Sequence, residues 1–120
     1  MQRFLSGLLL GILGSVLIFG AQHRASEKIV PPQVLMDNAK VKIERWGLQP
    51  GEGSPIHTHT LDHISVIIRG STLRDVETSG ATKEVVQKAG KVDYIPGTGR
   101  THSFANAGKS TYESIASELK

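Results

Sequence analysis

The sequence predicts an all-β domain, a sandwich or barrel built from short strands. Two observations carry this prediction: β-branched and apolar segments recur at roughly ten-residue spacing, and breaks that contain glycine separate them. The expected strands are residues 41–48, 56–60, 63–69, 73–78, 83–88, 92–95, 102–106 and 111–119.

The N-terminus differs from this pattern. Residues 4–21 are apolar apart from two serines, and they follow the positively charged Arg3. This run of eighteen residues fits a membrane-spanning helix, which needs about 17–25 residues, better than the shorter core of a signal peptide. We therefore expect residues 1–21 to be a hydrophobic helix, either a membrane anchor or a cleaved signal peptide. The domain would then lie outside the cytoplasm, tethered to the membrane or exported.

Residues 22–36 are expected to be a linker. They carry mixed charges and the pair Pro31-Pro32, and consecutive prolines disfavour a helix and stiffen an extended chain. His23 lies in this segment, far from the other histidines, and we do not expect it to bind a ligand. The folded domain is then predicted to comprise residues 37–120.

Composition narrows the function classes. A chain of 120 residues forms one domain at most, and the absence of cysteine excludes disulfides, cysteine-ligated zinc and thiol nucleophiles within it. The formal net charge is +3, with basic and acidic residues interspersed and few aromatic residues. Because nucleic-acid binding needs a basic stripe, we expect no nucleic-acid partner.

Histidines are concentrated in the centre of the chain. His57, His59 and His63 lie between Gly51 and Gly70, and His102 follows about forty residues later in the sequence GTGRTHSFAN. On an extended strand, His57 and His59 point to the same face, so both rings can reach one ion. Imidazole is a good ligand for zinc, copper, iron and nickel. The spacing therefore indicates a metal site.

These residues resemble the two motifs of the cupin superfamily. The first motif is Gly, five residues, His-x-His, three or four residues, Glu, six residues, Gly, and it is matched by Gly51, His57, His59 and Gly70, with His63 at the Glu position. The second is Gly, five residues, Pro-x-Gly, two residues, His, three residues, Asn, and it is matched by Gly90, Pro96, Gly99, His102 and Asn106. One extra residue between Pro96 and Gly99 departs from this pattern.

The resemblance implies a double-stranded β-helix, the jelly-roll barrel of cupins, preceded here by the hydrophobic N-terminal helix. Residues 37–120 are similar to small single-domain cupins that include beta-alanine-degradation proteins. The resemblance also makes residues 111–119 a strand, where the residues alone would allow a helix. A small sandwich has a thin core and an open edge strand, so we expect a homodimer.

The resemblance also implies that His57, His59 and His102 bind a divalent transition metal. His63 is open to three roles: a fourth ligand, a base beside the ligands, or a spectator. Asp62, one residue away, is its rival, or it accepts a proton from a ligand imidazole and fixes its tautomer.

Histidine in place of the motif Glu removes a negative charge from the site, which disfavours magnesium and calcium. Iron(II) is the preferred metal, since cupins with all-histidine sites include iron-dependent thiol and diketone dioxygenases. Zinc, nickel, copper or manganese are alternatives.

Two classes of function follow from this resemblance. The first is a metal-dependent enzyme, a non-haem dioxygenase acting on a small organic molecule. The second is a module that binds a metal or a small ligand without turnover, and a sugar-isomerase-like cupin is a further alternative. The sequence assigns no catalytic residue and no substrate, because a fold hosts many chemistries.

Overall fold

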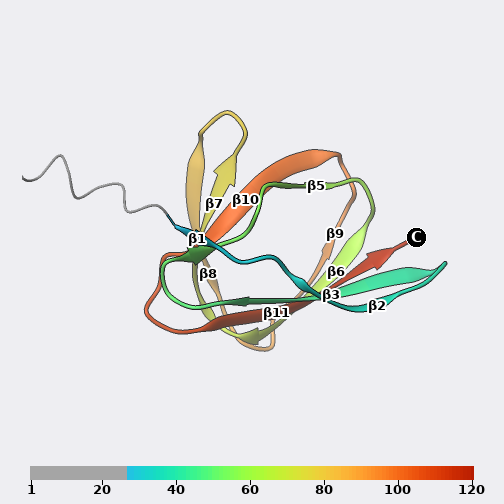
Figure 1. Cartoon of the computed structure of the whole chain (residues 1–120), viewed down its shortest axis with the longest axis horizontal. Helices are drawn as coiled ribbons and strands as arrows, with labels where there is room; N and C mark the ends of the chain where they lie inside the picture. The colour runs from blue at the N-terminus through green and yellow to red at the C-terminus, as the bar shows by residue number, and fades with distance from the viewer. Residues whose placement is uncertain (1–26) are drawn as a thin grey trace, which may run out of the picture.

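The computed structural model describes residues 27–120. Two mainly antiparallel sheets face each other and enclose one interior (Figure 1). The six-stranded sheet has the order β1-β4-β10-β7-β8, with β5 paired to β10, and the five-stranded sheet has the order β2-β3-β11-β6-β9. The strands of the first sheet are β1 (Lys28–Ile29), β4 (Glu52–Gly53), β5 (His57–His59), β7 (Ser71–Glu77), β8 (Thr82–Gln87) and β10 (Arg100–Asn106). Those of the second are β2 (Gln33–Asp37), β3 (Val41–Leu48), β6 (His63–Arg69), β9 (Val92–Ile95) and β11 (Tyr112–Leu119).

The predicted all-β class is confirmed, and each expected strand is present. Residues 41–48, 63–69 and 92–95 form strands with the predicted bounds. Residues 112–119 are a strand, β11, which pairs with β3 on one side and β6 on the other. The expected N-terminal helix, residues 1–21, lies outside the described residues. Within residues 27–120, no helix has the length and apolarity needed to cross a membrane.

Part of the segment expected to be a linker forms strands. β1 pairs in parallel with β4, and β2 pairs antiparallel with β3. Pro31 and Pro32, which have no backbone N–H to donate, lie in the connection between these two strands. Residues 28–37, which we call the strap, therefore pair with one sheet through β1 and with the other through β2.

Side chains alternate between the interior and the outside along the strands, as a pleated backbone requires. On β3, for example, Trp46 and Leu48 are buried, whereas Arg45 and Gly47 are exposed. The buried apolar residues form one cluster, Trp46, Leu48, Ile67, Leu73 and Tyr112, with Val30, Phe104 and Ala116 packed against it. Other buried positions carry polar side chains, and three of these, His63, His102 and Ser114, line the cavity described below.

Asn106, the last residue of the second motif, joins several elements at the closed end of the core. Its side chain is buried and donates to the carbonyls of Leu48 (3.0 Å) and Ser110 (2.7 Å). Its Oδ1 accepts from the Ser71 hydroxyl (2.8 Å) and from the amide of Gly108 (3.0 Å). One amide side chain thus links β3, β7, β10 and the turn that leads into β11.

This network predicts that Asn106→Ala lowers the free energy of unfolding by about 2–4 kcal/mol, because buried donors and acceptors lose their partner. Urea denaturation measures the loss. The matched control is Asn38→Ala, since the exposed Asn38 accepts from the amides of Lys40 and Val41 in a turn. Its loss should be about 1 kcal/mol or less. Equal losses in the two variants would contradict the role given to Asn106.

Candidate metal centre

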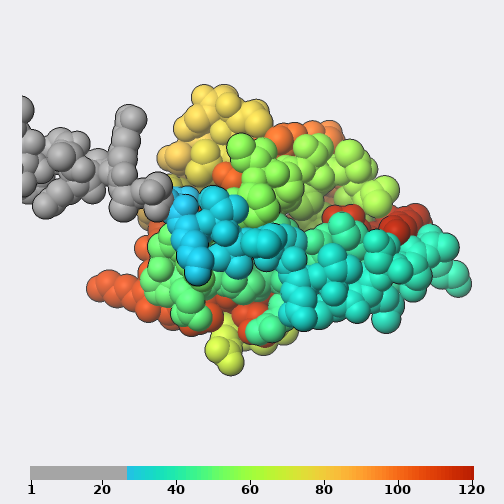
Figure 2. All heavy atoms as spheres, in the orientation of Figure 1, coloured from blue at the N-terminus to red at the C-terminus, as the bar shows by residue number. Residues whose placement is uncertain are grey.

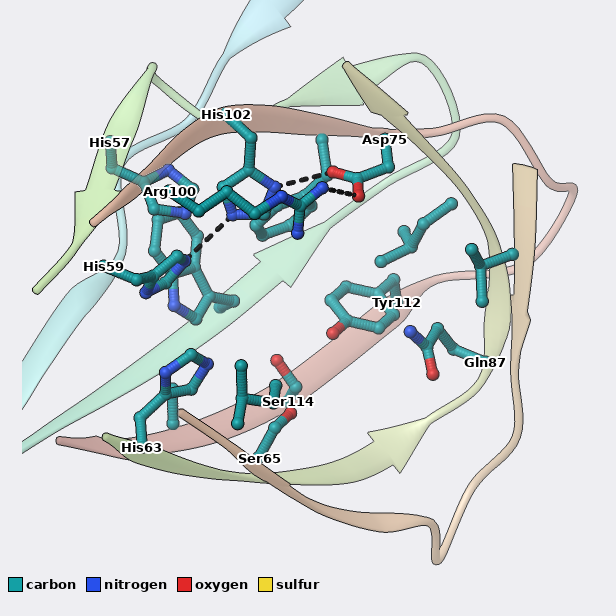
Figure 3. Close-up of a pocket in the computed structure, with 16 residues that line it drawn as sticks. His57, His59, His63, Ser65, Asp75, Gln87, Arg100, His102, Tyr112 and Ser114 are labelled. Atoms are coloured by element: carbon teal, nitrogen blue, oxygen red, sulfur yellow. Dashed lines mark hydrogen bonds and ion pairs between the residues drawn. The ribbon is translucent and has the colours of Figure 1, made fainter. Parts of the chain in front are cut away.

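Three of the predicted histidines meet where β5 pairs with β10. His57 and His59 are alternate residues of β5 and therefore point to the same side. In the antiparallel register His102 lies opposite His57, and Arg100 lies opposite His59. The extra residue in the second motif lies in the loop before β10 and leaves this register intact. Figure 3 shows the three rings turned toward one another.

The three rings are close enough to share one ion. One ring nitrogen from each of His57, His59 and His102 lies within 4.8 Å of the other two. The Nε2 atoms of His59 and His102 are 2.9 Å apart. Two ligands at right angles around an ion would be about 3 Å apart for a metal–nitrogen bond of about 2.1 Å. The observed separation fits this arrangement.

Hydrogen bonds fix the tautomers of two of these rings. His57 donates from Nδ1 to the carbonyl of Pro55 (2.9 Å), which leaves its Nε2 as a buried lone pair without a partner. His102 donates from Nδ1 to Oδ1 of Asp75 (2.6 Å), so its Nε2 accepts the hydrogen bond from Nε2 of His59 (2.9 Å). His59 Nδ1 is buried without a partner. Imidazole nitrogens that converge in this way suit a divalent transition metal, which would take the place of the hydrogen between His59 and His102, so these donors fit one.

Asp75 is one candidate site residue that the sequence did not indicate. It lies on the inner face of β7, two residues after the buried Leu73, and it also pairs with Arg100. Burial alone would raise the pKa of the Asp75 carboxyl, but the hydrogen bonds from Arg100 and His102 outweigh it and lower the pKa. Asp75 is therefore ionised, and it orients the His102 ring.

Only the register of β7 with β10 brings Asp75 to His102. On a strand, Asp75 points to the same side as the apolar Leu73, two residues before it, so the sequence could have placed the Asp75 carboxylate in the interior. It could not have placed that carboxylate beside a particular histidine. Arg100 is held in turn by Asp75 and Glu77. The histidine, the carboxylate and the guanidinium thus form one chain of contacts at the edge of the site.

His63 comes from β6 in the opposite sheet and does not join the three-nitrogen cluster. It is buried, and its ring stacks on His59 with centroids 4.4 Å apart and an angle of 20° between the planes. Lone pairs lie in the ring planes, so those of two nearly parallel rings do not meet at one ion. The Nδ1 atom of His63 is buried without a partner. Its role as a fourth ligand stays a prediction.

Asp62, the alternative to His63 as a site residue, makes its contacts elsewhere in the structure. Its carboxylate accepts from the amide of Gly97 (2.8 Å) and from the hydroxyl of Tyr94. The Gly97 amide and, after it, the Tyr94 hydroxyl lower the pKa of Asp62. A Cβ on Gly97 would lie only 2.5 Å from the carbonyl carbon of Leu61, so glycine is needed where these two loops touch. The carboxylate that accepts a hydrogen bond from a candidate ligand is that of Asp75.

Burial favours the neutral form of His59, His63 and His102. Desolvation, with smaller contributions from the neighbouring histidines and Arg100, lowers the pKa of His59 to about 4. Desolvation also lowers the pKa of His63 and that of His102, although the hydrogen bond to Asp75 opposes the shift at His102. Neutral rings are the form that binds a metal. The lowered pKa values therefore favour the ligating form of these rings at neutral pH.

The solved structures most similar to this chain include several cupins. A cupin domain from Bordetella pertussis has a TM-score of 0.72 and 23% identity, over 81% of this chain and 99% of that one. A Cupin 2 conserved barrel domain protein from Salinispora arenicola has a TM-score of 0.55 and 26% identity, over 74% of each chain. The polyketide cyclase RemF from Streptomyces resistomycificus has a TM-score of 0.54 and 22% identity, over 73% of this chain and 63% of that one.

No family model matches the sequence. No curated protein matches it either. The structural similarity, together with the two sheets and the three-histidine cluster, confirms the resemblance read from the motifs. The chain is a small single-domain protein with the cupin fold, in which histidine occupies the position of the motif Glu.

The lowered histidine pKa values predict that the metal-free protein loses stability in mild acid. Below about pH 6.5 the histidines of the unfolded chain bind protons, whereas His59 in the folded chain does so only near pH 4. The free energy of unfolding should be constant above about pH 7 and fall from there toward pH 4. Urea denaturation after removal of metal by a chelator measures this. His59→Gln should flatten the slope, and a flat profile in the wild type would contradict the pKa shifts.

The contact between Asp75 and His102 predicts that Asp75→Asn weakens Zn²⁺ binding about 10–100-fold, because His102 is no longer held in the right tautomer. Competition with a chromophoric chelator measures the affinity. The matched control is Glu77→Gln, which removes the other partner of Arg100 and leaves His102 untouched. Equal affinity in the two variants would show that Asp75 does not act through His102.

Proposed function

We propose that this protein binds one divalent transition metal through His57, His59 and His102 and uses it to bind a small organic molecule. The observation that carries the proposal is the convergence of three imidazoles, two of which are fixed by hydrogen bonds from their other nitrogen. His63, stacked on His59, lies close enough to become a fourth ligand if its ring turns.

The donor set favours particular ions. Three neutral imidazoles leave the ion its full charge, and they suit iron(II), zinc, nickel, copper or manganese better than magnesium or calcium. Iron(II) is our first choice because of the resemblance to all-histidine cupin dioxygenases. When bound, such an ion polarises a ligand at an open coordination position, and iron(II) also supports reactions with dioxygen.

A cavity beside the cluster supplies room for the organic molecule. Its volume is about 170 Å³, and all four central histidines line it. A smaller hollow of about 60 Å³ touches His59, His63 and His102 from the side of the loop that contains Pro96 and Thr98. The cluster is therefore in contact with space on two sides, which supports access for a small ligand.

We further propose oxidation of that molecule by dioxygen as the reaction. Support comes from the all-histidine donor set and from the cupin fold, which serves as an enzyme scaffold in the polyketide cyclase RemF. Binding of a metal and ligand without turnover is the competing function, and the oxygen measurement below separates the two.

Location and assembly are part of the proposal. Residues 4–21 would anchor the protein in the membrane or export it, with the cupin domain outside the cytoplasm. The edge strand β2 is exposed along its whole length and carries Val34, Leu35 and Met36, each about half exposed. Apolar side chains on an open edge favour pairing with a second copy, which supports a homodimer.

Metal analysis of the full-length, untagged protein tests the proposal. We expect about one ion per chain in the wild type and only traces in the His57→Ala/His59→Ala double variant, since the remaining donors cannot hold an ion. His23→Ala serves as the control, because His23 lies far from the motifs in the sequence. Equal trace metal in wild type and double variant would refute the site.

Oxygen consumption then separates an enzyme from a binding module. The iron(II)-loaded protein is mixed with candidate thiols and diketones, and the double variant is treated in the same way. Consumption that requires both the organic molecule and the two histidines would support the dioxygenase. A metal-loaded protein that consumes no oxygen with any of these compounds would support the binding module.

A further inference from the structure

The cavity has two chemically different ends. His57, His59 and His102 stand at one end, and Gln87 stands on the opposite side in Figure 3, with Tyr112 between them. Apolar side chains form much of the remaining wall: Trp46, Leu73, Val85 and Phe104. A ligand that fills the space must therefore match the histidine end, an apolar wall and the amide of Gln87.

Gln87 has an acceptor that nothing in the described chain satisfies. It lies near the end of β8, where Val85 and Gln87 line the cavity and Val86 points outward. Its Oε1 atom is buried and has no hydrogen-bond partner. A buried acceptor without a donor is unfavourable, so such groups in proteins are normally satisfied. A donor on a bound molecule would satisfy this one.

The charges of the cavity wall are already paired. Arg100 and Asp75 line the cavity, and they contact each other. Arg100 is also held by Glu77, and Asp75 also accepts from His102. No unpaired cation among the described lining residues faces a carboxylate or phosphate on a ligand. Because an unpaired charge in such a site is disfavoured, the cavity of the metal-free protein selects an uncharged molecule.

The volume limits the size of this molecule. The cavity measures about 170 Å³. A cavity of about 150 Å³ with apolar walls holds one benzene. Trp46 and Phe104, whose ring centroids are 5.1 Å apart, provide flat apolar walls. The space thus holds one ring or a short chain with one or two polar groups.

We propose that the cavity of the metal-free protein takes an uncharged molecule of about six to eight non-hydrogen atoms. Its apolar body packs against Trp46 and Phe104, and its hydroxyl or N–H group donates to Oε1 of Gln87. This inference rests on the proposed function, because it assigns the organic ligand of the same site. It makes Gln87 the residue that selects a hydrogen-bond donor.

Benzyl alcohol is a suitable probe, and Trp46 reports its binding. Trp46 is the one tryptophan of the sequence and lines the cavity, so its fluorescence follows occupancy. We expect benzyl alcohol to bind the metal-free full-length protein about tenfold more tightly than toluene, which has no donor for Gln87. Benzoate, which is charged, should bind at least about tenfold more weakly than benzyl alcohol. Equal affinities of benzyl alcohol and toluene would overturn the inference, and tight benzoate binding would overturn its uncharged class.

Gln87→Leu tests the anchor directly. It should remove the preference for benzyl alcohol over toluene, whereas the same substitution at the exposed Gln33 should leave the preference intact. Circular dichroism checks the fold of each variant. If Gln87→Leu does not fold, the affinities of the wild type for the three probes still test the inference. A preference that survives in folded Gln87→Leu would overturn the role of Gln87.

Metal content measured on the same preparations separates this inference from the proposed function. If the metal content is normal and the preference for benzyl alcohol over toluene is the same in wild type and Gln87→Leu, the ligand class is refuted and the metal site stands. A preference that depends on Gln87, in protein that never binds metal, refutes the metal site and leaves the ligand class standing.

Discussion

The pairing of β5 with β10 is the interaction on which the candidate site depends. β5 has only three residues, and two of them are histidines that face the interior. Its ladder with β10 places His102 opposite His57, and the loop before β10 is tied to β5 by the bond from the Gly99 amide to the His59 carbonyl (2.8 Å). A slip of one residue would turn the histidines to the other face of the sheet. The backbone register therefore sets the site.

A carboxylate lies beside the three-histidine cluster although histidine stands at the position of the motif glutamate. Among the described residues no carboxylate enters the three-nitrogen cluster itself, but Asp75 supplies a negative charge one ring away, through His102. Arg100 neutralises part of that charge from the other side. If the cluster holds an ion as we propose, this carboxylate would strengthen the His102 imidazole as a ligand.

The sequence predicted the fold and the histidines because both depend on local patterns. Strands such as 41–48 and 63–69 are recognisable from their β-branched residues and flanking glycines, and the spacing of His57 and His59 puts them on one face. The strands β1 and β2 were not predicted, since Pro31-Pro32 signals an extended linker and edge pairing depends on distant partners. Asp75 and Gln87 were missed for the same reason. Their roles come from the register of β7 and β8 with strands far away in the chain.

The strap has a mechanical consequence. β1 is a two-residue pairing with β4, supported by the hydrogen bond from the Val30 amide to the Gly53 carbonyl (2.8 Å), whereas four of the five residues of β2 pair with β3. Tension applied to the chain before residue 27 passes along the backbone in order, so β1 detaches first and β2 second. Short peripheral pairings open at lower free energy than the core. The strap therefore yields to a pulling force before that force reaches the strands that carry the histidines.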